Sequence, residues 1–132
     1  MTEKVTLQMR DNVKTEILDL VRIEMGSMKI GKLPPGFYAK LQRVLAQIKK
    51  EKDAWLTEGD ISEYIALNVQ EKDMQSNFKA LFEKRFEKLA GMSIYNLSED
   101  ILSRMTQEEK AAYTEYRFVT ERYFRILTEG EI

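Results

Sequence analysis

Apolar residues recur at helical spacing along most of this chain. Val13, Ile17 and Val21 follow one another every four residues, which predicts a first helix over about residues 11–25 with Asp11 or Asn12 as its N-cap. Three further helices are expected, over about residues 35–58, 61–90 and 107–128. The pattern therefore predicts an all-α fold, a bundle of about four main helices of which one is long.

The first ten residues have a different pattern. Val5, Leu7 and Met9 alternate with polar residues, which is the period of a strand, but a single short strand has no evident partner. Residues 1–10 are therefore expected to be an N-terminal arm, either extended or an extension of the first helix.

A rigid turn at residues 33–38 separates the first helix from the second. Pro34 restricts Leu33 to an extended conformation, so the first helix must end before it. Pro35 is expected early in the next helix, where its missing N–H costs nothing. Phe37 and Tyr38 then enter the apolar stripe of that helix, so we interpret these residues as a structural turn.

The ends of the later helices carry local signals. Gly91 is expected to end the long helix, and Ser98 to begin a short helical piece over residues 98–105. Thr106 and Glu109 have the spacing of a capping box, which predicts the start of the last helix.

The third helix is longer than a domain of this size needs. About 30 residues of helix extend about 45 Å, and the apolar residues cover more than one stripe. Either another subunit or neighbouring helices of the same chain must bury the second stripe. From helical phase we predict the following subunit-interface residues: Tyr64, Leu67, Met74 and Phe78 on the long helix, and Tyr116, Tyr123 and Phe124 on the last helix.

One face of the second helix is basic. Residues 29–52 hold seven basic residues against one acid, a net charge of +6. The candidate contacts to DNA or to a partner are Lys40, Arg43, Lys49 and Lys50. The alternative is a solvated face that keeps an amphipathic helix soluble.

Composition narrows the possible functions. A chain of 132 residues fits one domain, and its net charge of -1 favours neither nucleic acid nor membrane as a partner. The absence of cysteine and histidine excludes disulfides, thiolate chemistry, histidine bases and ordinary zinc sites. No apolar run approaches the length of a membrane span. We therefore expect a cytoplasmic protein.

The sequence offers no catalytic arrangement. Phosphate-binding glycine loops and the G-x-S-x-G motif are absent. Acid pairs at helical spacing, such as Glu83 with Glu87, have basic neighbours and fit solvated faces better than a metal or acid–base site. Tyrosines near Arg117 suit packing better than stacking on bases. No enzyme activity, cofactor or metal is expected.

The order of these features resembles a known family. The motif residues are Ile17 to Glu24, then Lys32-Leu33-Pro34-Pro35-Gly36-Phe37-Tyr38, then Phe82-Glu83-Lys84-Arg85-Phe86-Glu87-Lys88-Leu89, then Met105-Thr106-Gln107-Glu108-Glu109. Together they resemble the helical A domain of an archaeal GINS replication-complex subunit, of the type in which this domain precedes a small β-rich B domain. Gly36 departs from the family's turn, which commonly reads Leu-Pro-Pro-Asp-Phe-Tyr, and is expected to loosen the start of the second helix.

The resemblance implies a non-catalytic scaffold that is associated with the nucleoid. GINS subunits assemble as tetramers of one or two subunit types through their helical domains, and they link the MCM helicase to a RecJ-like protein at the replication fork. On this basis residues 11–128 are the expected A-type domain and residues 129–132 the start of a linker, with the B domain absent. The alternative is a small helical DNA-binding or regulatory module that uses the basic helix 35–58.

Overall fold

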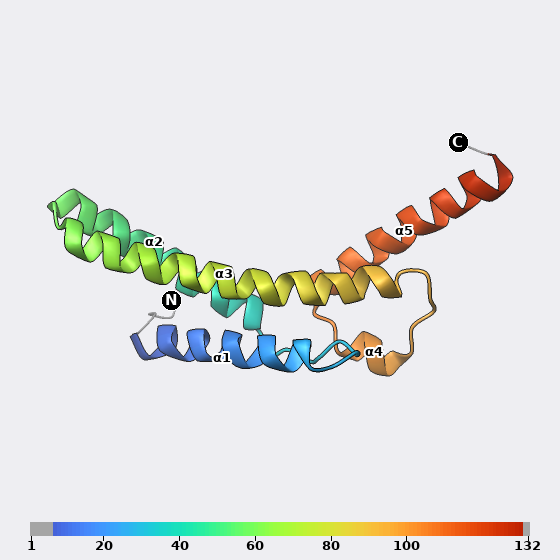
Figure 1. The fold of residues 1–132 in the computed structure, drawn as a ribbon, viewed down its shortest axis with the longest axis horizontal. Coiled ribbons are helices and arrows are strands. Elements are labelled where there is room, and N and C mark those ends of the chain that lie inside the picture. The colour runs from blue at the N-terminus through green and yellow to red at the C-terminus, as the bar shows by residue number, and fades with distance from the viewer. Residues whose placement is uncertain (1–6, 131–132) are drawn as a thin grey trace. The chain divides into compact units, whose positions relative to one another are not determined.

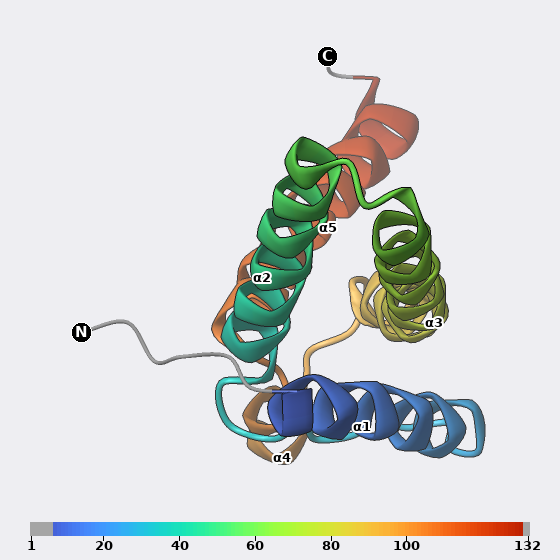
Figure 2. The same cartoon turned by 90° about the vertical axis from the view of Figure 1, so that its left-hand side faces the viewer.

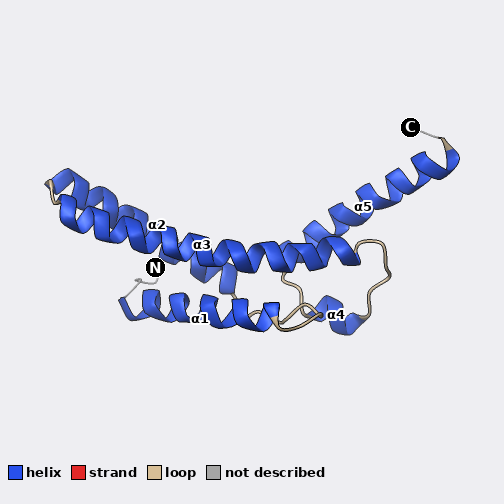
Figure 3. Cartoon of the chain, in the orientation of Figure 1, coloured by secondary structure: helices blue, strands red, loops and turns tan. Residues whose placement is uncertain are grey.

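The computed structural model describes residues 7–130, and every regular element in that range is a helix (Figures 1 and 3). The elements are α1 (Leu7–Met25), α2 (Phe37–Glu58), α3 (Ile61–Met92), α4 (Glu99–Ser103) and α5 (Gln107–Glu129). The predicted all-α class, with four main helices of which one is long, is confirmed.

The chain divides into two compact units. The first contains residues up to Arg22 together with Pro34–Leu81, and the second contains Ile23–Leu33 together with the chain from Phe82 onward. Helix α3 contributes its longer N-terminal part to the first unit and its last turns to the second.

The first unit is built from most of α1, all of α2 and the N-terminal part of α3. Figure 2 shows α2 and α3 side by side, joined by the turn at Gly59. Residues at three- and four-residue spacing on each helix bury its apolar face. The buried apolar residues of this unit are Val13, Ile17, Phe37, Leu41, Val44, Ile48, Leu67, Met74 and Leu81. They match the stripes that predicted the helices.

Partly buried ion pairs join the helices of the first unit. Lys52 of α2 donates to Glu71 Oε1 at 2.8 Å and to Asn68 Oδ1 at 3.0 Å, both on α3. The hydrogen bond from Lys52 to Glu71 raises the pKa of the Lys52 ammonium above its ordinary value. Arg10 of α1 donates in the same way to Glu51 of α2.

Helix α1 extends at least one turn further toward the N-terminus than predicted, to the first described residue. Asp11 and Asn12 lie inside the helix, which starts at Leu7, so their assignment as N-cap is wrong. The reason is tertiary: Arg10 is only 6% exposed and its ion pair with Glu51 holds the additional turn against α2. Of the two conformations expected for the arm, residues 7–10 adopt the helical one, and residues 1–6 lie outside the described residues.

The proline turn ends differently from its prediction. Helix α2 starts at Phe37, so Pro35 precedes the helix instead of lying in its first turn. Gly36 occupies the N-cap position with φ of 70°. A left-handed conformation favours glycine because it has no Cβ, so Gly36 suits the backbone of this turn, while it supplies no side-chain cap to the helix. Phe37 is 2% exposed, and the ring of Tyr38 packs edge-on against Phe78 at 6.0 Å between centroids.

Other helix ends follow their local signals, with one exception. The capping box of Thr106 and Glu109 is present, and the Ser98 side chain accepts a hydrogen bond from the Ile101 N–H at the start of α4. Gly91 does not end α3, which continues through it to Met92. A glycine within a helix costs only about 1 kcal/mol, so its neighbours determine where the helix ends.

The second unit has its own apolar core. Ile30, Leu89, Met105 and Tyr113 are buried together. They come from the segment after α1, the end of α3, the loop after α4 and the first half of α5. Partly buried apolar residues of α3, α4 and the adjoining loops surround this cluster.

A buried ion-pair network lies beside this core. Arg85 of α3 is 0% exposed and donates two hydrogen bonds, of 2.6 and 2.7 Å, to the carboxylate of Glu109 on α5. It also donates to Glu24 Oε1 of α1 at 2.7 Å and to the Gly31 carbonyl at 2.7 Å. Lys88 donates to the other oxygen of Glu24 at 2.6 Å. Because each charge meets an opposite charge and hydrogen-bond partners, the network can be buried without an unpaired ion.

Candidate assembly interface

The apolar stripe of α5 continues beyond the part of the helix that the second unit covers. Tyr113 is 8% exposed and belongs to the core, whereas Tyr116 is 37% exposed, Tyr123 53% and Leu127 82%. Figure 1 shows the C-terminal half of α5 extending beyond the end of α3 and α4. The residues that bury the first half of the stripe therefore leave its second half open to solvent.

The open half of α5 is apolar over more than one face. Phe118, Val119 and Phe124 are between 52% and 68% exposed, in addition to the residues of the stripe. A soluble helix with a single covered side normally keeps its other side polar. Large apolar side chains clustered on an uncovered helix are typical of a protein–protein interface.

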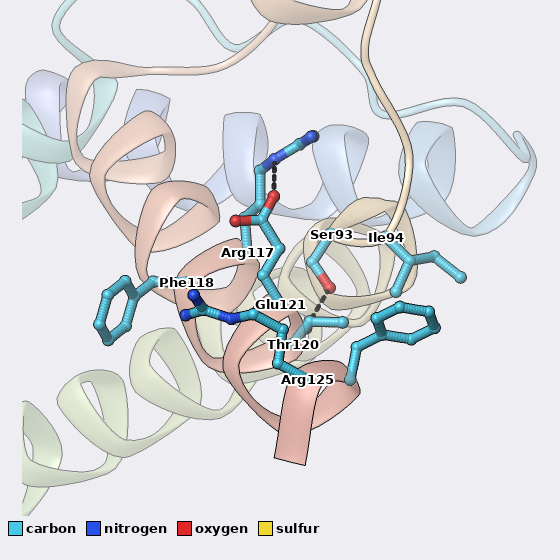
Figure 4. A pocket seen from close by; sticks show the side chains of 8 residues that line it. Ser93, Ile94, Arg117, Phe118, Thr120, Glu121 and Arg125 are labelled. Carbon is cyan, nitrogen blue, oxygen red and sulfur yellow. Dashed lines mark hydrogen bonds and ion pairs between the residues drawn. The ribbon is translucent and has the colours of Figure 1, made fainter. Parts of the chain in front are cut away.

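A pocket of about 630 Å³ lies where α5 meets the segment after α3 (Figure 4). Ile94, Phe118 and Phe124 supply its apolar lining. Ser93 and Thr120, which also line the pocket, share a hydrogen bond of 3.1 Å. The pocket can therefore receive an apolar side chain at the boundary between the covered and open parts of α5.

Hydrogen bonds hold the segment after α3 against α5. Arg117 donates to the Tyr95 carbonyl at 2.9 Å and to Asn96 Oδ1 at 2.7 Å. The Tyr113 hydroxyl donates to the same carbonyl at 2.9 Å, and Arg117 donates to that hydroxyl. The hydrogen bond with Tyr113 raises the pKa of the Arg117 guanidinium above its ordinary value, so Arg117 stays positively charged. These contacts fix the pocket wall.

The predicted interface residues of α3 lie in the first unit. Leu67 and Met74 are 6% and 3% exposed, which places them in its core, and Tyr64 and Phe78 are partly buried. They offer little surface to a second subunit in this conformation. The exposed apolar residues on this part of α3 are instead Ile61, Ile65 and Val69, at 52% to 55%.

Tyr116, Tyr123 and Phe124 of α5, in contrast, are exposed on one continuous helix. Phe118, Leu127 and Ile94, which the sequence interpretation did not select, lie beside them. The sequence indicated the α5 residues in part, because the apolar pattern of α5 continues for three turns after Tyr116. The sequence pattern does not show whether another helix of the chain covers those turns, because that depends on the tertiary structure.

The basic residues of α2 do not form a single free surface. Lys40 pairs with Glu16 of α1 at 3.5 Å, and Lys52 pairs with Glu71. Lys40 and Arg43 line a shallow pocket near the start of α2, and Lys49 and Lys50 are exposed about two turns later. The ion pairs neutralise part of the charge that would contact phosphates.

Two acidic residues of the helix surfaces, Asp19 and Glu87, lie beside basic partners. Asp19 accepts from Arg22 at 3.0 Å, and Glu87 lies 3.8 Å from Lys84. Among residues 7–130 no three acidic side chains gather in a way that would hold a metal ion. Within the same range, no helix has the length and apolar character needed to cross a membrane.

Comparisons with protein-family models, curated proteins and solved structures find no match for this chain. The likeness to GINS subunits therefore rests on the sequence motifs alone and stays a prediction.

Proposed function

We propose that this chain is a non-catalytic assembly subunit of a GINS-like DNA-replication complex. In this role it binds other subunits through exposed helical surface and links the replicative helicase to partner proteins. The order of motifs in the sequence suggests the family, and the surface of α5 suggests the mode of binding.

The observation that carries the proposal is the uncovered apolar half of α5. Tyr123, Phe124 and Leu127 are each more than half exposed on a helix whose first half is anchored by the buried Glu109. Burying such side chains contributes roughly 1.5–3 kcal/mol each, so a few of them suffice for a specific contact. Arg122 and Arg125, on the same helix, are suited to select the partner by charge.

Sedimentation equilibrium of the purified chain at micromolar concentration tests assembly. We expect a species larger than a monomer, and we expect Phe124→Glu to shift it toward the monomer because the charge would be buried in the interface. Ile65→Glu is the matched control, since Ile65 is similarly exposed (55%) but lies on α3 of the first unit. A wild-type chain that stays monomeric throughout would exclude self-assembly.

A binding measurement with the MCM helicase and the RecJ-like protein from the same organism tests the family assignment separately. We expect saturable binding to at least one of them. An assembled chain that binds neither would retain the assembly role but would contradict the replication role.

The DNA-binding alternative makes a different prediction. It requires affinity for duplex DNA that falls steeply with salt and drops when Lys49 and Lys50 are replaced by Ala. Because Lys40 and Lys52 are ion-paired within the first unit, we expect only weak binding, and we favour the assembly role.

A further inference from the structure

The end of the α2–α3 hairpin is acidic. Between Lys52 and Lys72 the chain has no basic residue, and this stretch contains the last turns of α2, the turn at Gly59 and the first turns of α3 (Figure 1). We call residues 53–70 the hairpin end. It holds four acids and so a net charge of -4, contributed by Asp53, Glu58, Asp60 and Glu63.

Neighbouring cations do not neutralise this charge. Lys52, the nearest base before the hairpin end, pairs with Glu71 just beyond it, so the four acids remain in excess. Asp60 accepts from the neutral backbone N–H of Glu63 at the start of α3, which leaves its charge uncompensated. Glu58 and Glu63 are exposed, and no ion pair joins either of them to a base within residues 7–130.

Large apolar side chains are exposed on the same stretch. Ile61, Ile65 and Val69 are 52%, 55% and 52% exposed and lie four residues apart on one side of α3. Side chains at this interval form a ridge that packs into the groove between the ridges of another helix. All three are β-branched and keep nearly one rotamer in a helix, so burying them loses little conformational entropy. The fold therefore leaves an ordered apolar ridge open beside the acids.

Charge determines what can cover this ridge. Two hairpin ends that faced one another would bring like charges together, which opposes pairing with the same surface of a second copy. The acids also repel the phosphates of nucleic acids and anionic lipid headgroups. A basic amphipathic helix suits both features, because its apolar side chains can pack on the ridge while its flanking cations meet Glu58 and Glu63.

We propose that the hairpin end binds a basic amphipathic helix of another protein. The apolar residues of that helix recur every three to four positions, and lysine or arginine flanks them. The surface belongs to the first unit and is independent of the proposed assembly through α5. The chain thus has two contact surfaces of different chemistry, one for assembly and one for a basic partner.

Fluorescence anisotropy with designed peptides tests this binding. The probe is a labelled, helix-stabilised peptide of about 18 residues with leucine at helical spacing and lysine at the edges of the apolar stripe. One comparison peptide has the same composition in scrambled order, and another has glutamate in place of lysine. We expect saturable binding of the basic peptide, which weakens as salt rises. The scrambled peptide should bind about tenfold more weakly, and the acidic peptide should not bind.

An apolar substitution tests whether the ridge is the site. Ile65→Ser should weaken binding of the basic peptide about tenfold, because it removes the centre of the ridge. Leu18→Ser is the matched control, since Leu18 is 48% exposed on α1 of the same unit, and it should leave the affinity unchanged. Circular dichroism checks that both variants are folded.

A second pair of variants tests the charge without changing the ridge. Glu58→Gln combined with Glu63→Gln should weaken binding about three- to tenfold and reduce its salt dependence. Glu108→Gln combined with Glu115→Gln removes two exposed carboxylates from α5 and should have little effect.

Three results would overturn the proposal. The basic peptide could fail to bind, or bind no better than its scrambled form, which would show that the ridge selects no helix. Unchanged affinity of Ile65→Ser would place the contact elsewhere. Sedimentation in which the wild type assembles without peptide and Ile65→Ser does not would show a second copy on the ridge. Conversely, a wild-type chain that is monomeric but binds the basic peptide would exclude self-assembly and retain this site.

Discussion

Arg85 shows how much one buried residue can organise. Its Nε and both terminal nitrogens donate to Glu109, Glu24 and the Gly31 carbonyl, and through them it joins three separate stretches of the second unit. Glu109 serves twice, since one of its oxygens also accepts from the Thr106 N–H in the capping box. The start of α5 is therefore held at its cap and in the core by the same carboxylate.

Replacing Arg85 by Met should destabilise the protein strongly. Glu24 and Glu109 would stay buried with fewer positive partners, and breaking a buried pair in this way costs about 3–5 kcal/mol. Urea unfolding measures the change. Lys84→Ala, one position earlier and in a surface pair, should change stability by no more than about 0.5 kcal/mol. Similar effects of the two substitutions would contradict the role of Arg85.

The Lys52–Glu71 pair predicts a change of stability at alkaline pH. Its hydrogen bond raises the pKa of Lys52 in the folded state, so the folded state holds this proton more tightly than the unfolded chain. The stabilisation is complete below the ordinary pKa of 10.5 and is lost as pH rises through the higher folded value. Glu71→Gln should therefore be less stable than the wild type at pH 8, and this difference should become smaller above pH 10.5. Urea titrations at each pH measure the free energy of unfolding of both proteins. A difference that grows with pH would contradict this assignment.

At the scale of elements, helix ends follow local chemistry where a side chain or a special backbone conformation sets them. Thr106 and Ser98 cap their helices as their sequence positions predict. Helix α1, in contrast, extends past its predicted caps Asp11 and Asn12, because Arg10 pairs with Glu51, 41 residues away in the sequence. Local signals thus fail where a distant contact contributes more than the cap.

Two glycine substitutions should have opposite effects on stability. Gly36→Ala forces a Cβ into a left-handed backbone conformation and should cost about 1–2 kcal/mol, although no atom lies within 4 Å of the new carbon. Gly91 lies within α3 in a helical conformation, and a Cβ there also meets no atom within 4 Å. Gly91→Ala should therefore stabilise the protein by about 0.5 kcal/mol. Thermal unfolding compares them. A neutral Gly36→Ala would mean that the turn does not need glycine.

At the scale of the whole molecule, the open half of α5 is the feature that the fold leaves incomplete. A dozen residues of helix with few tertiary contacts are marginally stable in water. Assembly would add the missing contacts and so order the helix.

Amide hydrogen exchange should therefore depend on concentration in residues 116–127. We expect fast exchange there in dilute, monomeric protein and slower exchange as the concentration rises, while Val44 and Ile48 of α2 stay protected at both concentrations. Exchange in residues 116–127 that does not change between monomer and assembly would place the interface on another surface.

The sequence by itself determined the helices, because each apolar stripe has a period that only a helix can place on one side, and turn residues such as Pro34 and Thr106 act locally. Tertiary structure alone decided which stripe faces inward. Leu67 and Ile65 look equally suited to an interface in the sequence, but in the fold Leu67 is buried and Ile65 is exposed. The same holds for the candidate site, where all three predicted positions on α5 are exposed but their neighbours Phe118 and Leu127 were not predicted. Burial depends on which helices meet, and that depends on contacts such as Arg85 with Glu24, 61 residues apart, which no local pattern encodes.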